Sequence, residues 1–247
     1  MIHIFEACVF VGYSFLAPII TAGGSMLVTN FLNIFGGIYL IKATGLTSAS
    51  FMINAIISLY IFKKDIVWRD VKNILPMAII GSFIGSLFLV NINPTILLSL
   101  MFVFSLYYIY KKIKIMDKVV IQKDSLLKEM AVGLFAGSVT GAALPGGGFL
   151  NAYFASKGFT LQQMYATLNF TLIFVWIVKV SVMLNSGILI PSDLIGAVIA
   201  APFLIGSNYL VRRGLIKLSK SATDKITILA MSIFSIYALV IIVKSFI

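Results

Sequence analysis

Apolar stretches long enough to cross a lipid bilayer follow one another along almost the whole of this 247-residue chain. A membrane-spanning helix needs about 20 predominantly apolar residues. Here 60% of the residues are hydrophobic and only 11% are charged, and a soluble globule of this length has too little interior to bury that much apolar surface. The pattern predicts an all-α, polytopic membrane protein without a separate soluble domain.

Eight of these stretches are long enough to be complete spans, and two are shorter. The eight lie near 3–20, 38–62, 73–91, 94–110, 130–144, 160–184, 194–211 and 226–245. The two short stretches, near 25–35 and 149–156, each follow a cluster of glycines. Because they are too short to cross a flat bilayer, we expect them to be half-helices.

Proline and capping residues indicate where several of these helices begin or break. Pro76 and Pro202 lie near the starts of their segments, where a missing N–H is tolerated, and Pro145 lies where a helix should break. Thr160 and Gln163 have the spacing of a capping box that opens the next helix.

The N-terminal segment and the single cysteine set further limits. The segment has neither a basic region nor a small-residue cleavage site, so we expect a first membrane helix rather than a signal peptide. Cys8 is the only cysteine, which excludes an intramolecular disulfide and a cysteine-rich metal site.

The formal net charge of +11 is concentrated in loops. Three loops hold almost all the basic residues: Lys63, Lys64, Arg69 and Lys72; Lys111, Lys112, Lys114, Lys118, Lys123 and Lys128; and Arg212, Arg213, Lys217, Lys220 and Lys225. By the positive-inside rule these loops face the cytoplasm, whereas the connections 91–95 and 185–193, which have no basic residue, face outward. The basic surplus thus indicates orientation and not a nucleic-acid partner.

An internal repeat relates the two halves at an offset of roughly 124 residues, the kind of weak symmetry that transporters show. The matching residues occur in the same order in both halves, with single-residue gaps. They are Ala22-Gly23-Gly24 with Gly146-Gly147-Gly148, Ala43-Thr44 with Ala166-Thr167, Asp70 with Asp193, Pro76 with Pro202, and Ile80-Gly81-Ser82 with Ile205-Gly206-Ser207.

The equivalent loops of the two halves differ in charge, which predicts that the halves are inverted. The loop after the first Ala-Thr helix is basic and the loop after the second is uncharged. Inversion requires an odd number of crossings, so we expect about five membrane segments per half, including one short broken helix, with both termini outside. The expected division is 1–115 for the first repeat, 116–128 for a cytoplasmic linker and 129–247 for the second. Lys42 would then lie on the outer side, against the charge rule.

These paired glycine and Ala-Thr elements resemble the sulfite exporter TauE/SafE family over nearly the whole chain. The first copy contains Ala22-Gly23-Gly24-Ser25 and Ala43-Thr44-Gly45-Leu46, and the second contains Gly146-Gly147-Gly148 and Ala166-Thr167-Leu168-Asn169. The resemblance implies transport, usually export, of sulfite, sulfoacetate or related organosulfur anions. Another small carboxylate or oxyanion stays an alternative substrate.

A helix that begins inside the membrane presents free N–H groups and the positive end of its dipole, which attract an anion. Glycines at such a helix start allow the anion to approach the backbone. We therefore expect a binding site without metal or cofactor, near the midplane, where the two short helices begin. Its candidate residues are Gly23, Gly24, Ser25, Asn30, Thr44, Gly146, Gly147, Gly148, Asn151, Thr167 and Asn169.

Each single glycine or threonine of this set also fits a simpler role in close helix packing, and the functional hypothesis depends on the pairing. Among the few ionisable residues within the apolar segments, Lys179 either snorkels to the outer headgroups or attracts the anion directly. An ion pair with Glu6 at similar depth is a further prediction.

Other function classes receive less support. The chain has no G-x-S-x-G or H-E-x-x-H motif, no intramembrane aspartate pair and a single histidine near the N-terminus, so an intramembrane enzyme would lack its general base. An anion channel and a structural membrane subunit stay open, as does homo-oligomer formation. The expected location is the cell membrane.

Overall fold

The computed structural model describes residues 8–10, 24–114, 125–144, 146–212, 228–229, 232 and 235–243, and the regular structure in them is helical throughout. The helices are α2 Gly24–Gly36, α3 Leu40–Phe62, α4 Trp68–Asn91, α5 Pro94–Lys114, α6 Leu126–Gly141, α7 Gly146–Ser156, α8 Leu161–Asn185, α9 Ile195–Ile199 and α10 Ala201–Arg212, with short 3₁₀ turns η1 Lys63–Asp65 and η2 Pro191–Leu194. The predicted segments 3–20 and 226–245 lie mainly outside the described residues.

Three of the described helical stretches are long and apolar enough to cross a membrane, namely Leu40–Asp65, Trp68–Asn91 and Gln162–Asn185. Helix α4 also turns large apolar side chains outward, among them Phe83, Leu87 and Phe88. Water disfavours an apolar face of this kind, whereas lipid tails accept it. The chain is therefore an integral membrane protein, as its composition predicts.

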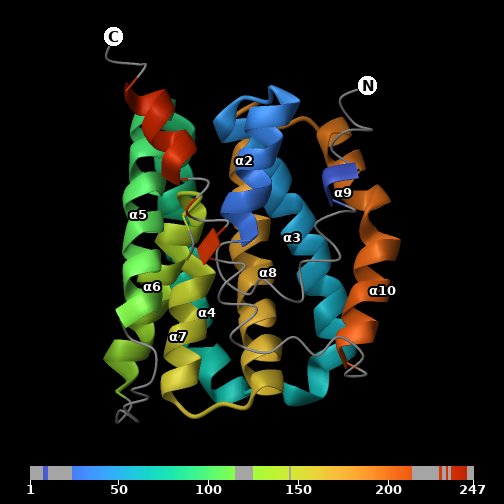
Figure 1. Cartoon of the computed structure of the whole chain (residues 1–247). Coiled ribbons are helices and arrows are strands. Elements are labelled where there is room, and N and C mark those ends of the chain that lie inside the picture. Colours follow the sequence, from blue (N-terminus) through green and yellow to red (C-terminus); the bar gives the residue numbers. More distant parts are fainter. Residues whose placement is uncertain are drawn as a thin grey trace.

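The long helices lie side by side and run between two ends of a bundle (Figure 1). One end holds η1, the C-terminal ends of α5 and α10 and the start of α6, which are the described parts of the basic loops (Figure 1). The opposite end holds the α4–α5 and α8–η2 connections, which have no basic residue. We call these the basic end and the uncharged end.

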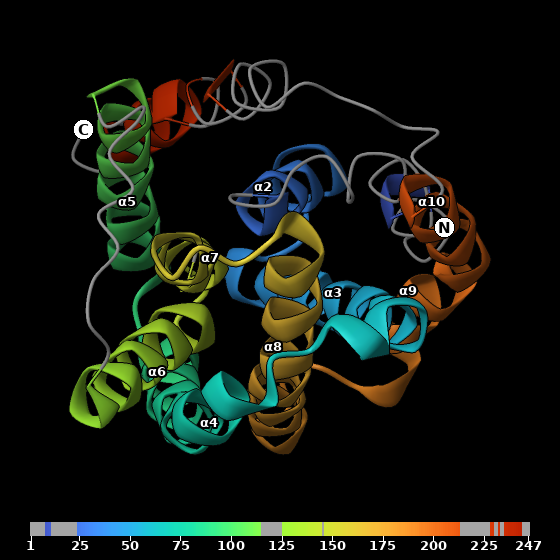
Figure 2. The ribbon, with the colours of Figure 1, turned by 90° about the horizontal axis from the view of Figure 1, so that it is seen from below.

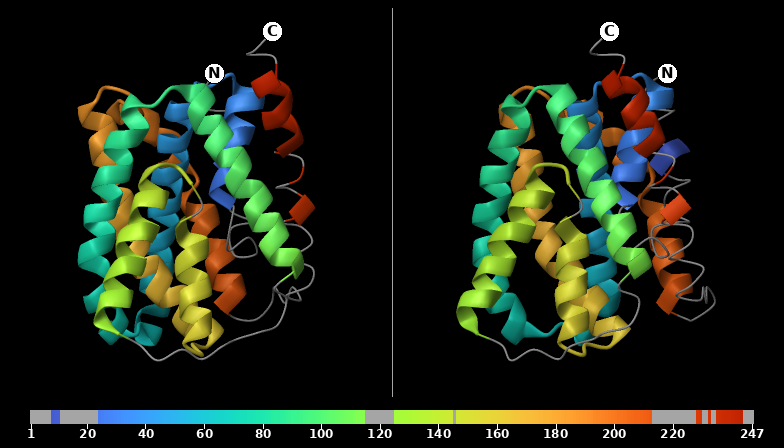
Figure 3. Two further views of the ribbon diagram at one scale, coloured as in Figure 1. Left: turned by 90° about the vertical axis from the view of Figure 1, so that its left-hand side faces the viewer. Right: turned by 60° about the vertical axis from the view of Figure 1, so that its left-hand side comes forward.

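Helices α2 and α7 are the two predicted short pieces, with 13 and 11 residues. Both begin near the middle of the bundle, and they run toward opposite ends, α2 toward the uncharged end and α7 toward the basic end (Figures 1 and 3). The prediction that both are short helices is confirmed. Their opposite directions agree with the expected inversion of the halves.

Helix α6 differs from the sequence prediction, which treated 130–144 as a complete span. Its 16 residues extend only about 24 Å, less than the hydrocarbon thickness, and α7 returns beside it toward the basic end (Figure 3). The helix stops because the chain turns at Ala142, Ala143 and Leu144. Together α6 and α7 form a hairpin whose turn lies inside the bundle.

A Schellman-type turn ends α6. The Leu144 N–H donates to the Val139 carbonyl (2.9 Å) and the Ala143 N–H to the Thr140 carbonyl (3.1 Å). Ala143 adopts the left-handed conformation that this turn requires, with φ of 67°. Glycine is the usual residue there because a Cβ atom disfavours that conformation.

Helices α4 and α6 approach so closely that their backbones touch. A Cβ atom added at Gly85 would overlap the Ser138 carbonyl oxygen, and one added at Gly137 would overlap the Ala78 carbonyl oxygen. Small residues permit this approach of membrane helices, because lipid provides little hydrophobic drive for association. The α4–α6 seam therefore holds the hairpin in place.

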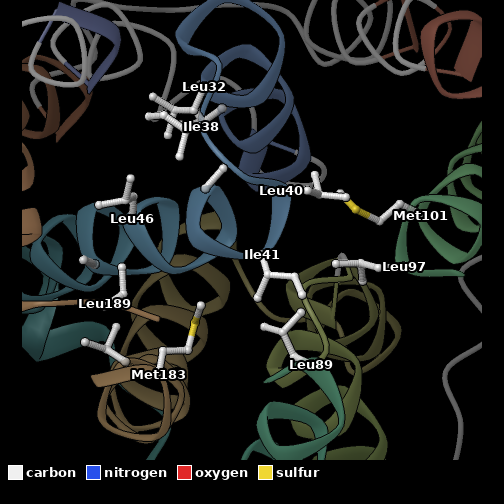
Figure 4. Packing of buried hydrophobic residues seen from close by; sticks show 14 of the residues in the cluster. Leu32, Ile38, Leu40, Ile41, Leu46, Leu89, Leu97, Met101, Met183 and Leu189 are labelled. Carbon is white, nitrogen blue, oxygen red and sulfur yellow. The ribbon is translucent and has the colours of Figure 1, made fainter. Parts of the chain in front are cut away.

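Helices α3 and α8 lie at the centre of the bundle (Figure 2). Helix α4 packs against α8, whereas α9 and α10 pack against α3. Toward the uncharged end, apolar side chains from several helices join them: Leu46 of α3, Met183 of α8 and Leu189 meet beside Leu89 of α4 and Leu97 of α5 (Figure 4). This core fixes the long helices around the two short ones.

Two local predictions need correction, and one is confirmed. The predicted span 194–211 is divided at Ala200 into α9 and α10, because Pro202 lacks the N–H that a continuous helix would use. Pro76 lies inside α4 and not near its start, since that helix begins at Trp68. The capping box is confirmed: the Thr160 N–H donates to Gln163 Oε1 (3.0 Å), and the Gln163 N–H donates to Thr160 Oγ1 (3.3 Å).

Candidate anion site and its surroundings

The glycine cluster of the second half forms the first turn of α7. A Cβ atom at Gly146 would overlap Thr140 Oγ1 of α6, and one at Gly147 would lie 3.2 Å from Leu172 Cδ1 of α8. The first N–H groups of a helix have no partner within it. The Gly146 N–H donates to the Leu144 carbonyl (2.7 Å), so the donors that this turn offers between α6 and α8 are those of the residues after Gly146. Gly146 is needed for packing in any case, whereas Gly148 is half-buried.

The first half contributes less to the described site. Helix α2 begins at Gly24, while Gly23 and the side chains of Ser25 and Asn30 lie outside the described residues and side chains. Thr29 of α2 is buried, and its hydroxyl donates to Thr47 Oγ1 of α3 (3.0 Å). That bond fixes α2 against α3.

The other predicted donors are largely engaged by the protein backbone. The Thr44 hydroxyl donates to the Ile41 carbonyl (2.7 Å), and the Asn169 amide donates to the Tyr165 carbonyl (2.8 Å). Such bonds within a helix satisfy a polar side chain without a ligand.

Thr167 and Asn151 complete the predicted set. Thr167 Oγ1 accepts the Val67 N–H (3.1 Å) and so fixes the segment between η1 and α4. Asn151 is half-buried on α7, about one and a half turns from the helix start. The structure thus groups Gly146, Gly147 and Gly148 with the end of α6, and a binding role for the predicted residues stays a prediction.

Lys179 does not snorkel to the membrane surface. Its side chain is buried, with the residue only 2% exposed, and its Nζ atom lies 3.5 Å from the Thr140 carbonyl at the end of α6. A cation near a helix C-terminus is favoured by the partial negative charge there. Glu6, its predicted partner, lies outside the described residues, so that ion pair stays a prediction.

A buried ionic cluster at the basic end was not expected from the sequence. Lys157, which follows α7, donates to Asp70 of α4 and to Glu129 Oε1 of α6 (2.5 Å), and Asn73 donates to the other Glu129 oxygen. Asp70 and Glu129 are 3% and 2% exposed, so water does little to screen this cluster. We call these four residues the inner cluster.

A second ion pair lies at the uncharged end. The Lys42 Nζ atom of α3 is 2.9 Å from Asp193 Oδ1 of η2, and Asp193 Oδ2 accepts the Ile190 N–H (2.9 Å). We call Lys42 and Asp193 the outer pair. This pair explains why a basic residue lies on the side that the positive-inside rule expects to have none: the buried carboxylate of Asp193 is the partner of Lys42.

One feature of the sequence indicates both the inner cluster and the outer pair. Asp70 and Asp193 match in the repeat, and each opens a helix beside an apolar segment. Their partners, Lys157 and Lys42, come from the other half of the chain in each case. Partners more than 80 residues away cannot be assigned from spacing alone. An aspartate at matching positions of the two halves nevertheless indicates that Asp70 and Asp193 each need an oppositely charged partner.

The family comparison agrees with this architecture. No curated protein and no solved structure matches the chain significantly. The profile of the sulfite exporter TauE/SafE family matches residues 5–239. Because the match includes both glycine clusters and nearly all the helices, the chain belongs to the sulfite exporter TauE/SafE family of membrane transporters.

Proposed function

We propose that this protein is a carrier that exports a small sulfur oxyanion, such as sulfite or sulfoacetate, across the cell membrane. Family membership supports the transporter class, and the α6–α7 hairpin supports an anion site. The observation that carries the proposal is the start of α7 inside the bundle (Figure 3), because the first N–H groups of a helix have no carbonyl partner within it and can bind an anion. Transport, without a cofactor or metal, is the activity we propose.

We further propose that the two halves are inverted repeats of about five membrane segments each. Helices α2 and α7 run in opposite directions, as inversion requires (Figure 1). The packing is also reciprocal. Helix α4 of the first half lies against α8 of the second half, and α9 and α10 of the second half lie against α3 of the first half. Inverted repeats permit alternating access by moving one half against the other.

The anion would be held where the two short helices begin. Gly24, Gly147 and Gly148 are the described backbone positions that we assign to this contact. An inside-negative membrane potential favours export of an anion by about 2.3 kcal/mol per charge for each 100 mV. The mechanism therefore needs no proton relay.

Flux measurements in proteoliposomes test the proposal. Vesicles loaded with sulfite should release it at a rate that saturates with internal concentration, and dissipating the potential should slow this release. Flux that stays linear with concentration would instead identify an anion channel, and flux that follows a pH gradient while ignoring the potential would identify electroneutral coupling.

Two glycine variants test the location of the site. Gly148→Leu should abolish sulfite flux while the protein still inserts into the membrane. Gly206→Leu on α10 is the matched control, because among the described residues no atom outside its own stretch of helix lies within 4 Å of a Cβ atom placed there. Normal flux through Gly148→Leu would show that the site is elsewhere.

A further inference from the structure

Lys179 is a buried lysine, and it has no carboxylate partner among the described residues. Lys42 and Lys157 each contact a carboxylate, whereas Lys179, 2% exposed, contacts only the Thr140 carbonyl at the long distance of 3.5 Å. An ammonium group inside a membrane protein is strongly disfavoured unless something compensates its charge. Among the described residues, one carbonyl leaves two of its three donors unused.

Ser86 of α4 is a second unsatisfied polar group at the same level. It is fully buried, and among the described residues its Oγ atom has no hydrogen-bond partner. One turn earlier, the Ser82 hydroxyl donates to the Val175 carbonyl of α8 (2.7 Å). Helices α4 and α8 run in the same direction (Figure 1). One further turn on each helix therefore brings Ser86 and Lys179 to the same height.

The last turn of α6 brings these two residues to one place. A Cβ atom at Gly141 would lie 3.0 Å from the Ser86 backbone nitrogen, and the neighbouring Thr140 carbonyl contacts Lys179. Two polar groups that lack a full set of partners among the described residues therefore border the turn that leads from α6 to α7.

The start of α7 borders the same region. Leu172, which lies 3.2 Å from the Cβ position of Gly147, precedes Lys179 by two turns on the same face of α8. Gly146 lies against Thr140, whose carbonyl contacts Lys179. A charged group held by Lys179 can thus also meet the N-terminal end of α7.

We infer that Lys179 and Ser86 are anion-binding residues, and that they hold one oxyanion group against the turn between α6 and α7. The inference rests on the proposed transport function and names the residues that select its substrate. An ammonium and a hydroxyl donate hydrogen bonds to separate oxygens, so the site takes a sulfite ion or the sulfonate of an organic molecule in preference to chloride.

Thermal unfolding of the purified protein tests this assignment. The probes are sodium sulfite, sodium methanesulfonate and sodium chloride at equal ionic strength. Sulfite or methanesulfonate should raise the melting temperature of the wild type above its value in chloride. Lys179→Met should weaken that effect at least tenfold in apparent affinity, Lys179→Arg should retain part of it, and Ser86→Ala should weaken it severalfold.

Stability without the probes separates binding from a structural role. Because no carboxylate of the described residues compensates the charge of Lys179 when the site is empty, Lys179→Met should unfold at the same temperature as the wild type or higher. A lower temperature, or failure to fold, would assign Lys179 to the protein scaffold and overturn the inference. A loss of stability shared with Glu6→Gln would identify an internal ion pair and would also overturn it.

The controls are Lys64→Met, which removes an exposed charge, and Ser99→Ala, whose hydroxyl donates within α5 to the Thr95 carbonyl (2.8 Å). Both should respond to the probes as the wild type does. If the wild type binds an oxyanion and Lys179→Met binds it equally well, the inference fails while the proposed function stands. If the wild type neither binds nor transports any oxyanion, the proposed function fails as well.

Discussion

Lys42 and Asp193 join the two halves of the chain at the uncharged end of the bundle, with 2.9 Å between Lys42 Nζ and Asp193 Oδ1. At the basic end, Lys157 of the second half contacts Asp70 of the first. Asp70 and Asp193 match in the internal repeat, so each half supplies an aspartate to a lysine of the other. The two contacts therefore connect the halves at opposite ends of the bundle.

The outer pair predicts unequal effects of removing its two members. Asp193→Asn should destabilise the protein by about 1 kcal/mol, because the amide oxygen can still accept the Ile190 N–H and the Lys42 side chain, 34% exposed, is screened by water. Lys42→Met should cost more, about 3 kcal/mol, because it leaves the buried Asp193 carboxylate, 6% exposed, without a counter-ion. Chemical unfolding in detergent measures both, and equal effects would contradict this account.

The inner cluster predicts a larger effect. Lys157→Met leaves two carboxylates buried together without a counter-ion and should cost about 3–5 kcal/mol. Adding Asp70→Asn to this variant should restore part of the loss, which a double-mutant cycle measures. Lys64→Met, at an exposed position of the same end, should be nearly neutral. Strict additivity in the cycle would show that Lys157 and Asp70 do not interact.

The α4–α6 seam predicts intolerance of a single methyl group. Gly85→Ala places its Cβ atom on the Ser138 carbonyl oxygen, so the helices must separate, at about 3 kcal/mol. Gly206→Ala should have no such penalty, because the space around it is open. The two melting temperatures provide the comparison, and similar values would mean that the helices do not touch at Gly85.

The turn between α6 and α7 predicts a stabilising substitution. Ala143→Gly should increase stability by about 1 kcal/mol, because glycine adopts the φ of 67° more readily than alanine. The reverse change, Gly158→Ala at φ of 76°, should decrease stability by a similar amount. The backbone conformation is the only cause, because no atom of the described residues lies within 4 Å of the added Cβ atom. Unfolding of both variants checks the sign, and a destabilised Ala143→Gly would rule out the left-handed turn.

The predicted orientation can be measured by cysteine labelling. In a Cys8→Ser background, Lys64→Cys and Ser186→Cys should react with an impermeant thiol reagent from opposite sides of the membrane. Both residues are exposed. Lys64 lies in η1 at the basic end, and Ser186 lies in the α8–η2 connection at the uncharged end. Labelling of both from one side would contradict the inverted topology.

Several features of the fold could be predicted from the sequence because they depend on local physics. Segments 25–35 and 149–156 are too short to span a bilayer wherever they pack. The corresponding helices are α2, Gly24–Gly36, and α7, Gly146–Ser156, close to the predicted bounds. The Thr160–Gln163 capping box was likewise predictable, because a cap joins neighbouring residues.

Other features depended on the tertiary structure. The sequence placed Lys179 within reach of the headgroups, and only the packing of α8 against α4 and the end of α6 shows that its side chain turns inward. The sequence indicated that Asp70 has a counterpart in the second repeat. It did not indicate that Lys157, 87 residues away, is the partner of Asp70.

The sequence by itself determined that this chain is a membrane protein, where its short helices lie and which loops share a side, because hydropathy, glycine and charge act over one turn or one segment. The tertiary structure decided which buried charges meet and which has no carboxylate partner among the described residues. Ion pairing and burial depend on helices distant in sequence, so the outer pair, the inner cluster and the isolated Lys179 appear only when α3, α4, α6 and α8 are assembled.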